Sequence, residues 1–182
     1  MTDISLHIPE FKELWYRQKL LSEPETMSYN AGYNLGFEGY DNDTGCIDFP
    51  ESDWADWYNY FCESKDRFYA YIVANGEFIG EVNLHKASVN IYNNTYNMGI
   101  VIEAKHRGKG YAVPALKLLL KQAFEVMDAD AVINDFEDSR SAHAAEKTHK
   151  HCGFEEVEKR DGMTVYKLTR QKYLQGNTKI QL

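Results

Sequence analysis

The spacing of apolar residues predicts two helices in the first third of the chain. Apolar positions recur every three or four residues from residue 10 to about residue 21, and Pro24 lies just beyond this stretch. A second helix is expected to begin at Pro50, where aromatic residues repeat at the same spacing: Trp54, Trp57, Tyr58 and Phe61. Between them, residues 29–45 are rich in Gly, Asn and Asp, which indicates turns and a loop that could face a substrate.

The middle of the chain changes to the pattern of strands. Two strands are expected over residues 67–73 and 77–84, because Asn75-Gly76 between them is the favoured two-residue turn of a hairpin. A third strand is expected over residues 95–103. Up to residue 103, the chain therefore consists of a helical part followed by a run of three strands that begins at residue 67.

The second half alternates between helices and strands. An amphipathic helix is expected from about residue 111 to 127, with Pro114 in its first turn, where a missing N–H costs no hydrogen bond. After it we expect a short buried strand over 131–134, a helix over 141–152 closed by Gly153, and two strands over 154–159 and 164–169 around Asp161-Gly162. The order ααβββαβαββ predicts a mixed α/β sheet with helices on its faces.

A basic, glycine-rich loop separates the third strand from the long helix. Gly108 and Gly110 let the backbone turn so that its N–H groups face one point, and Arg107 and Lys109 add positive charge. The following helix adds free amides and the positive end of its dipole. The loop lacks both the Gly-Lys-Ser/Thr ending of a magnesium-dependent P-loop and the spacing of a dinucleotide fold. It predicts a pyrophosphate site without a metal, with an exposed turn as the alternative.

These features resemble the GNAT acetyltransferase superfamily, which binds acetyl-coenzyme A through an Arg/Gln-x-x-Gly-x-Gly/Ala loop. Arg107, Gly110 and Ala112 match this pattern, and Gly153-Phe154 matches the Gly-Phe that precedes the sixth strand of that superfamily. The resemblance covers roughly residues 68–169. It implies a GNAT-like acyl-CoA N-acyltransferase fold of the α/β class, with a central, mostly antiparallel sheet flanked by helices. A chain of 182 residues with 43% hydrophobic residues is expected to form one domain over 1–182. The resemblance implies an acceptor side over about 10–63 and an acetyl-CoA-binding core over about 67–170.

The same resemblance implies a reaction and a set of binding residues. The reaction is direct transfer of acetyl from acetyl-CoA to a primary amine. A strand edge would bind the pantetheine arm and acetyl carbonyl, and the glycine loop would bind the pyrophosphate. The residues concerned are Ile100, Val101, Ile102, Arg107, Gly108, Lys109, Gly110, Tyr111 and Ala112. The three apolar residues can equally be sheet core, and the two roles are compatible.

The residue that would protonate the departing thiolate differs from the family pattern. The family has a tyrosine four places before the Gly of Gly-Phe, where this chain has His149. Helical spacing with Ala145 and Cys152 places His149 on the inward-facing stripe. An imidazolium, with a pKa near ~6.5, could donate the proton. A hydrogen-bonded core histidine, a tyrosine from elsewhere, or no acid at all are the alternatives.

A carboxylate on a central strand is the candidate general base. Strand alternation puts Glu81 on one face with Ile79 and Asn83, and by resemblance the central strands border the acceptor cleft. A structural salt bridge is the alternative role for Glu81. Two weaker candidates are Glu103, which lies at a strand end, and Asp135, which fits a helix cap.

The net charge of -8 narrows the choice of partner. Nucleic acids and anionic lipids require a basic face, so neither a nucleic acid nor a membrane is expected as partner. Aromatic and acidic residues are interspersed over 29–63, a combination that binds cations through ring faces and ion pairs. Core packing of the aromatic residues and solvation of the acids are the alternatives. We expect the acceptor to be a small cationic amine, such as a polyamine or an aminoglycoside, or a peptide amine.

The remaining features concern location, metals and other functions. Three widely spaced cysteines, no signal-peptide pattern, and no apolar run near the ~20 residues of a membrane span favour a soluble, cytoplasmic protein. His149, His151 and Cys152 crowd together but point apart on a helix, so no metal site is expected. A non-catalytic acyl-CoA-binding sensor or interaction module on the same fold is the alternative function. The acceptor and a homodimeric state are left open.

Overall fold

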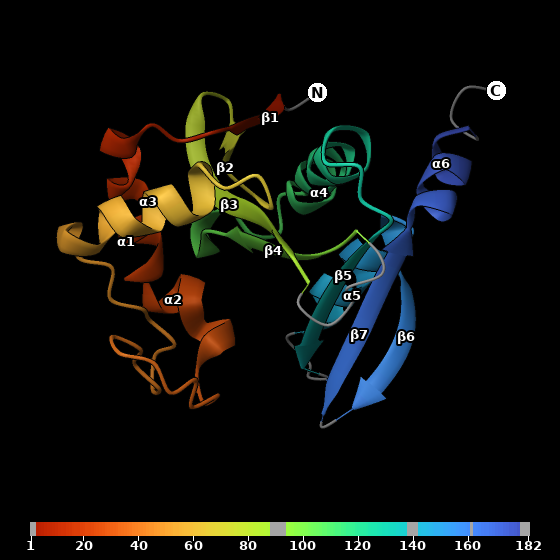
Figure 1. Cartoon of the computed structure of the whole chain (residues 1–182). Coiled ribbons are helices and arrows are strands. Elements are labelled where there is room, and N and C mark those ends of the chain that lie inside the picture. The colour runs from red at the N-terminus through yellow and green to blue at the C-terminus, as the bar shows by residue number, and fades with distance from the viewer. Residues whose placement is uncertain (1–2, 88–93, 138–141, 161, 179–182) are drawn as a thin grey trace. The chain divides into compact units, whose positions relative to one another are not determined.

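The computed structural model describes residues 3–87, 94–137, 142–160 and 162–178. Its strands are joined by hydrogen bonds in the order β1-β2-β3-β4-β5-β7-β6 (Figure 1). They are β1 (Ile4–His7), β2 (Arg67–Ala74), β3 (Glu77–Lys86), β4 (Thr95–Ile102), β5 (Ala131–Glu137), β6 (Glu155–Arg160) and β7 (Met163–Thr169). β4 and β5 are parallel, whereas β1–β2, β5–β7 and β6–β7 pair antiparallel. The predicted mixed α/β class with a mostly antiparallel sheet flanked by helices is confirmed.

Six α-helices accompany these strands in the described part of the chain. They are α1 (Trp15–Leu21), α2 (Pro24–Met27), α3 (Trp54–Cys62), α4 (Ala112–Lys121), α5 (Ala142–His151) and α6 (Arg170–Thr178). A π-helical segment, Gln122–Val126, continues α4, so the expected helix over 111–127 changes its winding after Lys121. Ser141, expected to begin a helix, and Asp161, expected in a turn, lie outside the described residues.

The backbone contacts divide the chain into two compact units. The first comprises Met1–Val82 and Ile100–Tyr111, and the second Asn83–Gly99 and Ala112–Leu182. Both β3 and β4 therefore contribute residues to each unit. This division does not follow the expected boundary between an acceptor side over 10–63 and a core over 67–170, and the single-domain organisation stays a prediction.

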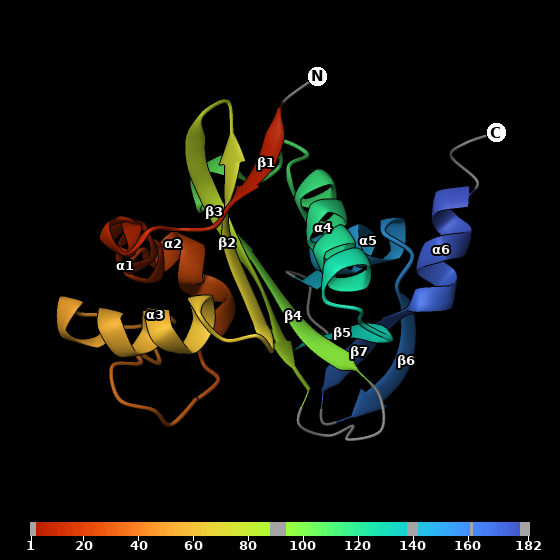
Figure 2. The same ribbon diagram turned by 45° about the horizontal axis from the view of Figure 1, so that its top comes forward.

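The first unit packs helices against β2. Helix α3 lies against this strand (Figure 2). Apolar side chains of the helices, of β2 and of the loop before α3 form two buried clusters. One comprises Leu14, Leu21, Met27, Phe49 and Trp54, and the other Tyr16, Leu20, Tyr69 and Tyr71.

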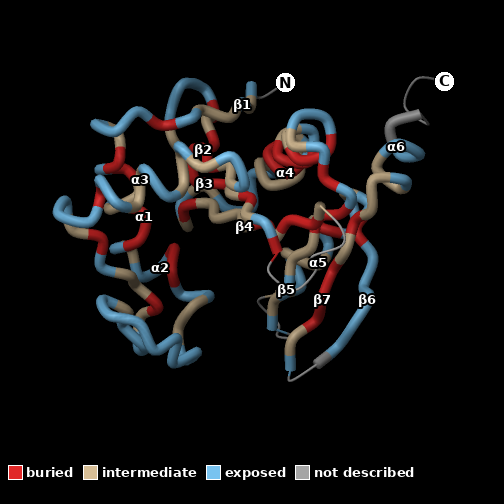
Figure 3. The backbone as a smooth tube through the Cα atoms, viewed as in Figure 1, coloured by how far each residue is buried: buried red, intermediate tan, exposed pale blue. Residues whose placement is uncertain are grey.

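The second unit has its core under α4, which lies beside α5. The predicted apolar stripe of α4 is confirmed, because Leu116, Leu119 and Leu120 are all buried (Figure 3). The Gly153 cap is also confirmed: Gly153 follows α5 with φ +90°, a left-handed conformation that glycine adopts without steric cost.

Three elements were not predicted, and each lacks a strong local pattern. β1 has only four residues, too few for alternation to stand out. α2 begins at Pro24, because proline is favoured in the first helical turn; the sequence analysis placed Pro24 after a helix rather than at the start of one. α6 has its large apolar residues, Tyr173 and Leu174, adjacent rather than periodic.

Candidate functional site

The glycine loop, Arg107–Tyr111, lies between the 3₁₀ turn Ala104–His106 and helix α4. Gly108 and Gly110 have φ values of +74° and +82°, which few other residues adopt. A Cβ atom added to either glycine would meet no atom within 4 Å, so the space beside the loop is open. Such a turn directs successive backbone N–H groups towards an anion. The loop therefore fits the pyrophosphate of acetyl-CoA, and the binding itself stays a prediction.

The side chain of Arg107 is bonded to the protein's own backbone. Its Nε donates to the carbonyl oxygen of Ile102 at 3.0 Å. Its Nη1 and Nη2 donate to the carbonyl oxygens of Glu25 at 3.1 Å and Thr26 at 2.6 Å, both in α2. The sequence predicted a positive charge and a pyrophosphate-binding role at this position, whereas the structure shows two bonds from the side chain to helix α2 and one to the end of β4.

The edge of β4 that is predicted to bind the pantetheine arm lies very close to Gly80 of the neighbouring strand β3. Ile100, Val101 and Ile102 are half-buried, which is compatible with packing and with exposed backbone. A Cβ atom added to Gly80 of β3 would lie 2.1 Å from the carbonyl oxygen of Val101, so only glycine fits there. The path of β4 at this edge therefore depends on the absence of a side chain at Gly80.

Glu81, the candidate base, is buried and paired with Arg17 of α1. Its Oε1 and Oε2 lie 2.6 and 2.8 Å from Arg17 Nη1, and the Tyr69 hydroxyl donates to Oε2. Burial opposes the charge on Arg17, but the Glu81 carboxylate and the Tyr69 side chain together outweigh it and raise the pKa of Arg17 above its ordinary value. The guanidinium carbon also lies 4.4 Å from the ring centroid of Trp57. This geometry corresponds to the salt-bridge alternative, and the role of Glu81 as base stays a prediction.

His149, the candidate acid, is 1% exposed within α5 and has both ring nitrogens bonded. Nδ1 lies 2.8 Å from the Ala145 carbonyl oxygen, and Nε2 lies 3.0 Å from Nδ2 of Asn134. Because a carbonyl only accepts, Nδ1 carries the hydrogen and Nε2 accepts from the Asn134 amide. Three aromatic rings have centroids between 5.0 and 5.9 Å from the imidazole: Phe136, Phe154 and Tyr166. His149 is inward-facing, as predicted, and its bonds correspond to the core alternative; the acid role stays a prediction.

The burial of His149 predicts a pH dependence of stability. Burial lowers the pKa of His149 below its ordinary value of 6.5. The unfolded chain therefore binds a proton more readily than the folded protein, and stability present above about pH 6.5 is lost as the pH falls below it. We expect His149→Gln to flatten this slope by up to one proton, about 1.4 kcal/mol per pH unit. Urea unfolding between pH 5 and 8 measures the slope.

A matched control for this measurement lies on the same helix. The side chain of His143 is 81% exposed, so His143→Gln is expected to leave the slope as in the wild type. An equal slope in the His149→Gln and wild-type proteins would contradict a neutral, buried imidazole.

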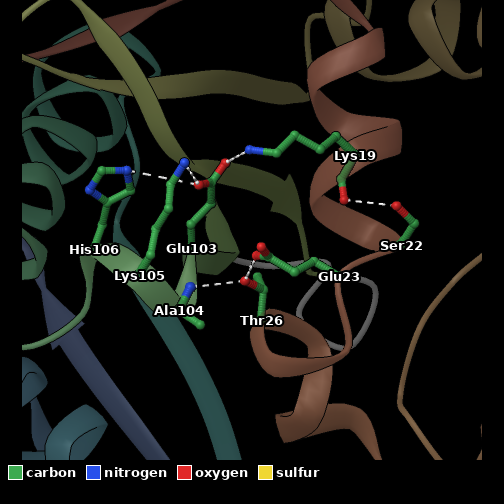
Figure 4. Close-up of polar contacts among 8 residues, drawn as sticks. All are labelled: Lys19, Ser22, Glu23, Thr26, Glu103, Ala104, Lys105 and His106. Carbon is green, nitrogen blue, oxygen red and sulfur yellow. Dashed lines mark hydrogen bonds and ion pairs between the residues drawn. The ribbon is translucent and has the colours of Figure 1, made fainter.

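Glu103 lies at the centre of a cluster that the sequence analysis did not predict (Figure 4). Its carboxylate is fully buried, with Oε1 2.6 Å from Lys19 Nζ and Oε2 2.9 Å from Lys105 Nζ. His106 Nε2 lies 3.8 Å from Oε2. Burial favours the neutral acid, but the two lysines outweigh it and hold the pKa of Glu103 below its ordinary value. The only local signal was the position of Glu103 directly before a basic loop.

The aromatic residues over 29–63 differ in burial. Phe49 and Trp54 belong to the core, as the alternative reading expected. Tyr29, Tyr33 and Phe37, in the loop after α2, are between 37% and 48% exposed. The loop therefore carries the ring faces that could meet a cationic acceptor.

The predicted site residues fall in both units. Glu81, Ile100–Ile102 and the glycine loop belong to the first unit, whereas Ala112 and His149 belong to the second. Within the described residues, no group of three His, Cys, Asp or Glu side chains is arranged to hold a metal ion. Nor does any helix in that part of the chain have the length and apolar character needed to cross a membrane.

Comparison with known proteins links these features to one family. The family model of the acetyltransferase (GNAT) domain matches residues 7–155. Comparison with curated protein sequences gives no match. Among solved structures, spermidine N-acetyltransferase from Vibrio cholerae, in complex with CoA and spermine, is 19% identical, with a TM-score of 0.72 over 94% of this chain and 98% of that one.

Two further structures have the same fold. An acetyltransferase (GNAT family) from Bacillus anthracis is 17% identical, with a TM-score of 0.68 over 94% of this chain and 98% of that one. A nucleotide-linked sugar GNAT is 15% identical, with a TM-score of 0.68 over 97% of this chain and 92% of that one. At these identities the likeness concerns the fold.

Proposed function

We propose, because this chain belongs to the acetyltransferase (GNAT) family, that it transfers the acetyl group of acetyl-CoA to a primary amine. The observation that carries the proposal is the open glycine loop that follows β4, with both glycines in left-handed conformations. In this proposal the backbone of 107–112 receives the pyrophosphate, and the backbone of 100–102 receives the pantetheine arm and acetyl carbonyl. Acetyl-CoA supplies the acetyl group as a thioester.

The proposed acceptor is a small cationic amine, with a polyamine as the first to test. The exposed rings of Tyr29, Tyr33 and Phe37 and the net charge of -8 support a cation. The likeness in fold to a spermidine N-acetyltransferase supports the choice of polyamines. A peptide amine, an aminoglycoside or an amino sugar would use the same chemistry at nitrogen.

The amine must lose a proton before it attacks, since an alkyl ammonium has a pKa near ~10. Glu81 is the proposed base, but its carboxylate is held by Arg17, so an incoming ammonium would compete with one cation already in place. Glu103 is also ion-paired, with Lys19 and Lys105. A chain of water molecules is the alternative route for this proton.

We expect steady release of free CoA thiol when the protein is given acetyl-CoA with spermidine or spermine. A panel that also contains an aminoglycoside, a lysine peptide and an amino-sugar nucleotide identifies the acceptor class. Tight binding of acetyl-CoA by calorimetry, without turnover of any amine, would overturn the enzymatic proposal. It would instead favour a non-catalytic acyl-CoA sensor, an alternative supported by the bonded imidazole of His149 where the family has a tyrosine.

A further inference from the structure

Two segments of the first unit are joined by a set of direct polar bonds. We call residues 19–26, which end α1 and include most of α2, the acceptor-side segment. Residues 102–107, which end β4 and begin the glycine loop, are the donor-side segment. Arg107 donates to the carbonyl oxygens of Glu25 and Thr26, and Lys19 donates to Glu103 at 2.6 Å. The two segments are therefore held together by charged hydrogen bonds, which are stronger than neutral ones.

Thr26 adds a further bond between the same segments. Its hydroxyl accepts from the backbone N–H of Ala104 at 2.9 Å and donates to the carboxylate of Glu23 (Figure 4). Thr26 is fully buried, so a lost bond at Ala104 would not be replaced easily by water. The Ala104 N–H thus depends on a side chain of the acceptor-side segment.

The bonds of Arg107 require its shape as well as its charge. One guanidinium reaches three carbonyl oxygens at once, one at the end of β4 and two in α2. A lysine ammonium has the same charge but cannot form this planar fork. Replacing Arg107 by lysine therefore separates an electrostatic role from a positioning role.

We propose that Arg107 is a positioning residue that couples the donor loop to the acceptor-side segment, so that CoA and the amine acceptor bind cooperatively. The names of the two ligands rest on the proposed function. CoA stabilises the loop geometry in which Arg107 holds Glu25 and Thr26. This orders α2 and the start of the loop that carries the exposed rings, beginning at Tyr29. CoA thereby raises the affinity of the protein for the amine acceptor. By thermodynamic linkage, the acceptor raises the affinity for CoA by the same factor.

Amide hydrogen exchange of the full chain tests the attachment directly. In the protein without ligand, Arg107→Lys and Thr26→Val are expected to raise exchange about tenfold at residues 23–27 and at Ala104. Thr26→Ser retains the hydroxyl and is expected to restore the wild-type rate. Ser22→Ala is the matched control, because the bond from the Ser22 hydroxyl to the carbonyl oxygen of Lys19 lies within the acceptor-side segment.

The second measurement tests the coupling. In the wild type, CoA is expected to slow amide exchange at residues 23–27. Saturating spermidine is expected to tighten CoA binding severalfold, as measured by calorimetry. Both effects are expected to become small or vanish in Arg107→Lys and Thr26→Val. In these two variants, the KM for the amine at saturating acetyl-CoA is expected to rise severalfold. If both variants, without ligand, exchange the amides of residues 23–27 at the wild-type rate, the inference is overturned, whatever their acetyltransferase activity. Normal coupling in Arg107→Lys also overturns it.

These outcomes are distinct from failure of the proposed function. If CoA binds and protects 23–27 but no amine is acetylated, the attachment stands and the enzymatic proposal fails. If acetyl transfer occurs and Arg107→Lys changes only the affinity for CoA, the enzyme stands, Arg107 acts on the phosphate alone, and the coupling is wrong.

Discussion

Arg17→Met is expected to lower the free energy of unfolding by about 3–5 kcal/mol, the cost of leaving one member of a buried ion pair alone. The side chains of Arg17 and Glu81 are 16% and 6% exposed, and the guanidinium lies over Trp57. Methionine retains an apolar chain of similar length but supplies no charge. Glu81 would then keep the hydrogen bond from the Tyr69 hydroxyl but lose both contacts with Arg17. Urea unfolding followed by circular dichroism measures the loss.

Two variants make this result specific. Arg17→Met combined with Glu81→Met is expected to recover most of the lost stability, because a well-packed apolar pair can replace a buried ion pair. Lys12→Met removes an exposed partner of Glu10, with side chains 77% and 64% exposed, and should leave the free energy of unfolding nearly unchanged because solvent screens this pair. If Arg17→Met lowers the free energy of unfolding no more than Lys12→Met does, the Arg17–Glu81 pair does not stabilise the fold. A folded double variant that still acetylates amines would exclude Glu81 as the base.

Gly80→Ala is expected to weaken CoA binding at least tenfold, and to cost about 1–3 kcal/mol of stability, as overpacking commonly does. The new methyl group would lie 2.1 Å from the Val101 carbonyl oxygen and 2.9 Å from the Ile102 Cα. Both neighbours are backbone atoms, so no side chain can rotate away, and β4 itself must shift. This shift would displace the strand edge proposed to bind the pantetheine arm. Calorimetric titration with CoA and urea unfolding measure the two effects.

Gly176→Ala serves as the matched control for Gly80→Ala. Gly176 lies in α6, and a Cβ atom there would meet nothing within 4 Å. Alanine is favoured over glycine in helices, so stability should stay the same or rise by up to about 1 kcal/mol, with unchanged affinity for CoA. Wild-type affinity in Gly80→Ala would remove the support for a binding role of 100–102.

Features set by neighbouring residues could be predicted from the sequence. Asn75 and Gly76 have φ values of +51° and +82°, as expected for the two-residue turn between β2 and β3. The glycine loop and the cap at Gly153 were also predicted, because left-handed conformations favour glycine at fixed places beside a strand or helix. Local chemistry was sufficient in these cases.

Features set by distant residues could not be predicted. Arg17 and Glu81 are 64 positions apart, and Lys19 and Glu103 are 84 apart. Which carboxylate meets which cation depends on how α1 packs, and no spacing rule reports that. The sequence indicates both carboxylates as candidate bases and leaves a salt-bridge role open for Glu81. Only the folded chain shows the cation beside each of them.

The pairing of β1 with β2 bears on how copies of this chain behave towards one another. Ile4 lies opposite Ala74 and His7 opposite Tyr71, so β1 covers the outer edge of β2. β2 is eight residues of mainly aromatic and branched side chains without proline. A bare edge of that composition is a template for strand addition and aggregation, whereas a short edge strand is a poor one. Pairing with the four residues of β1 thus leaves a poor template for strand addition at this edge of the sheet.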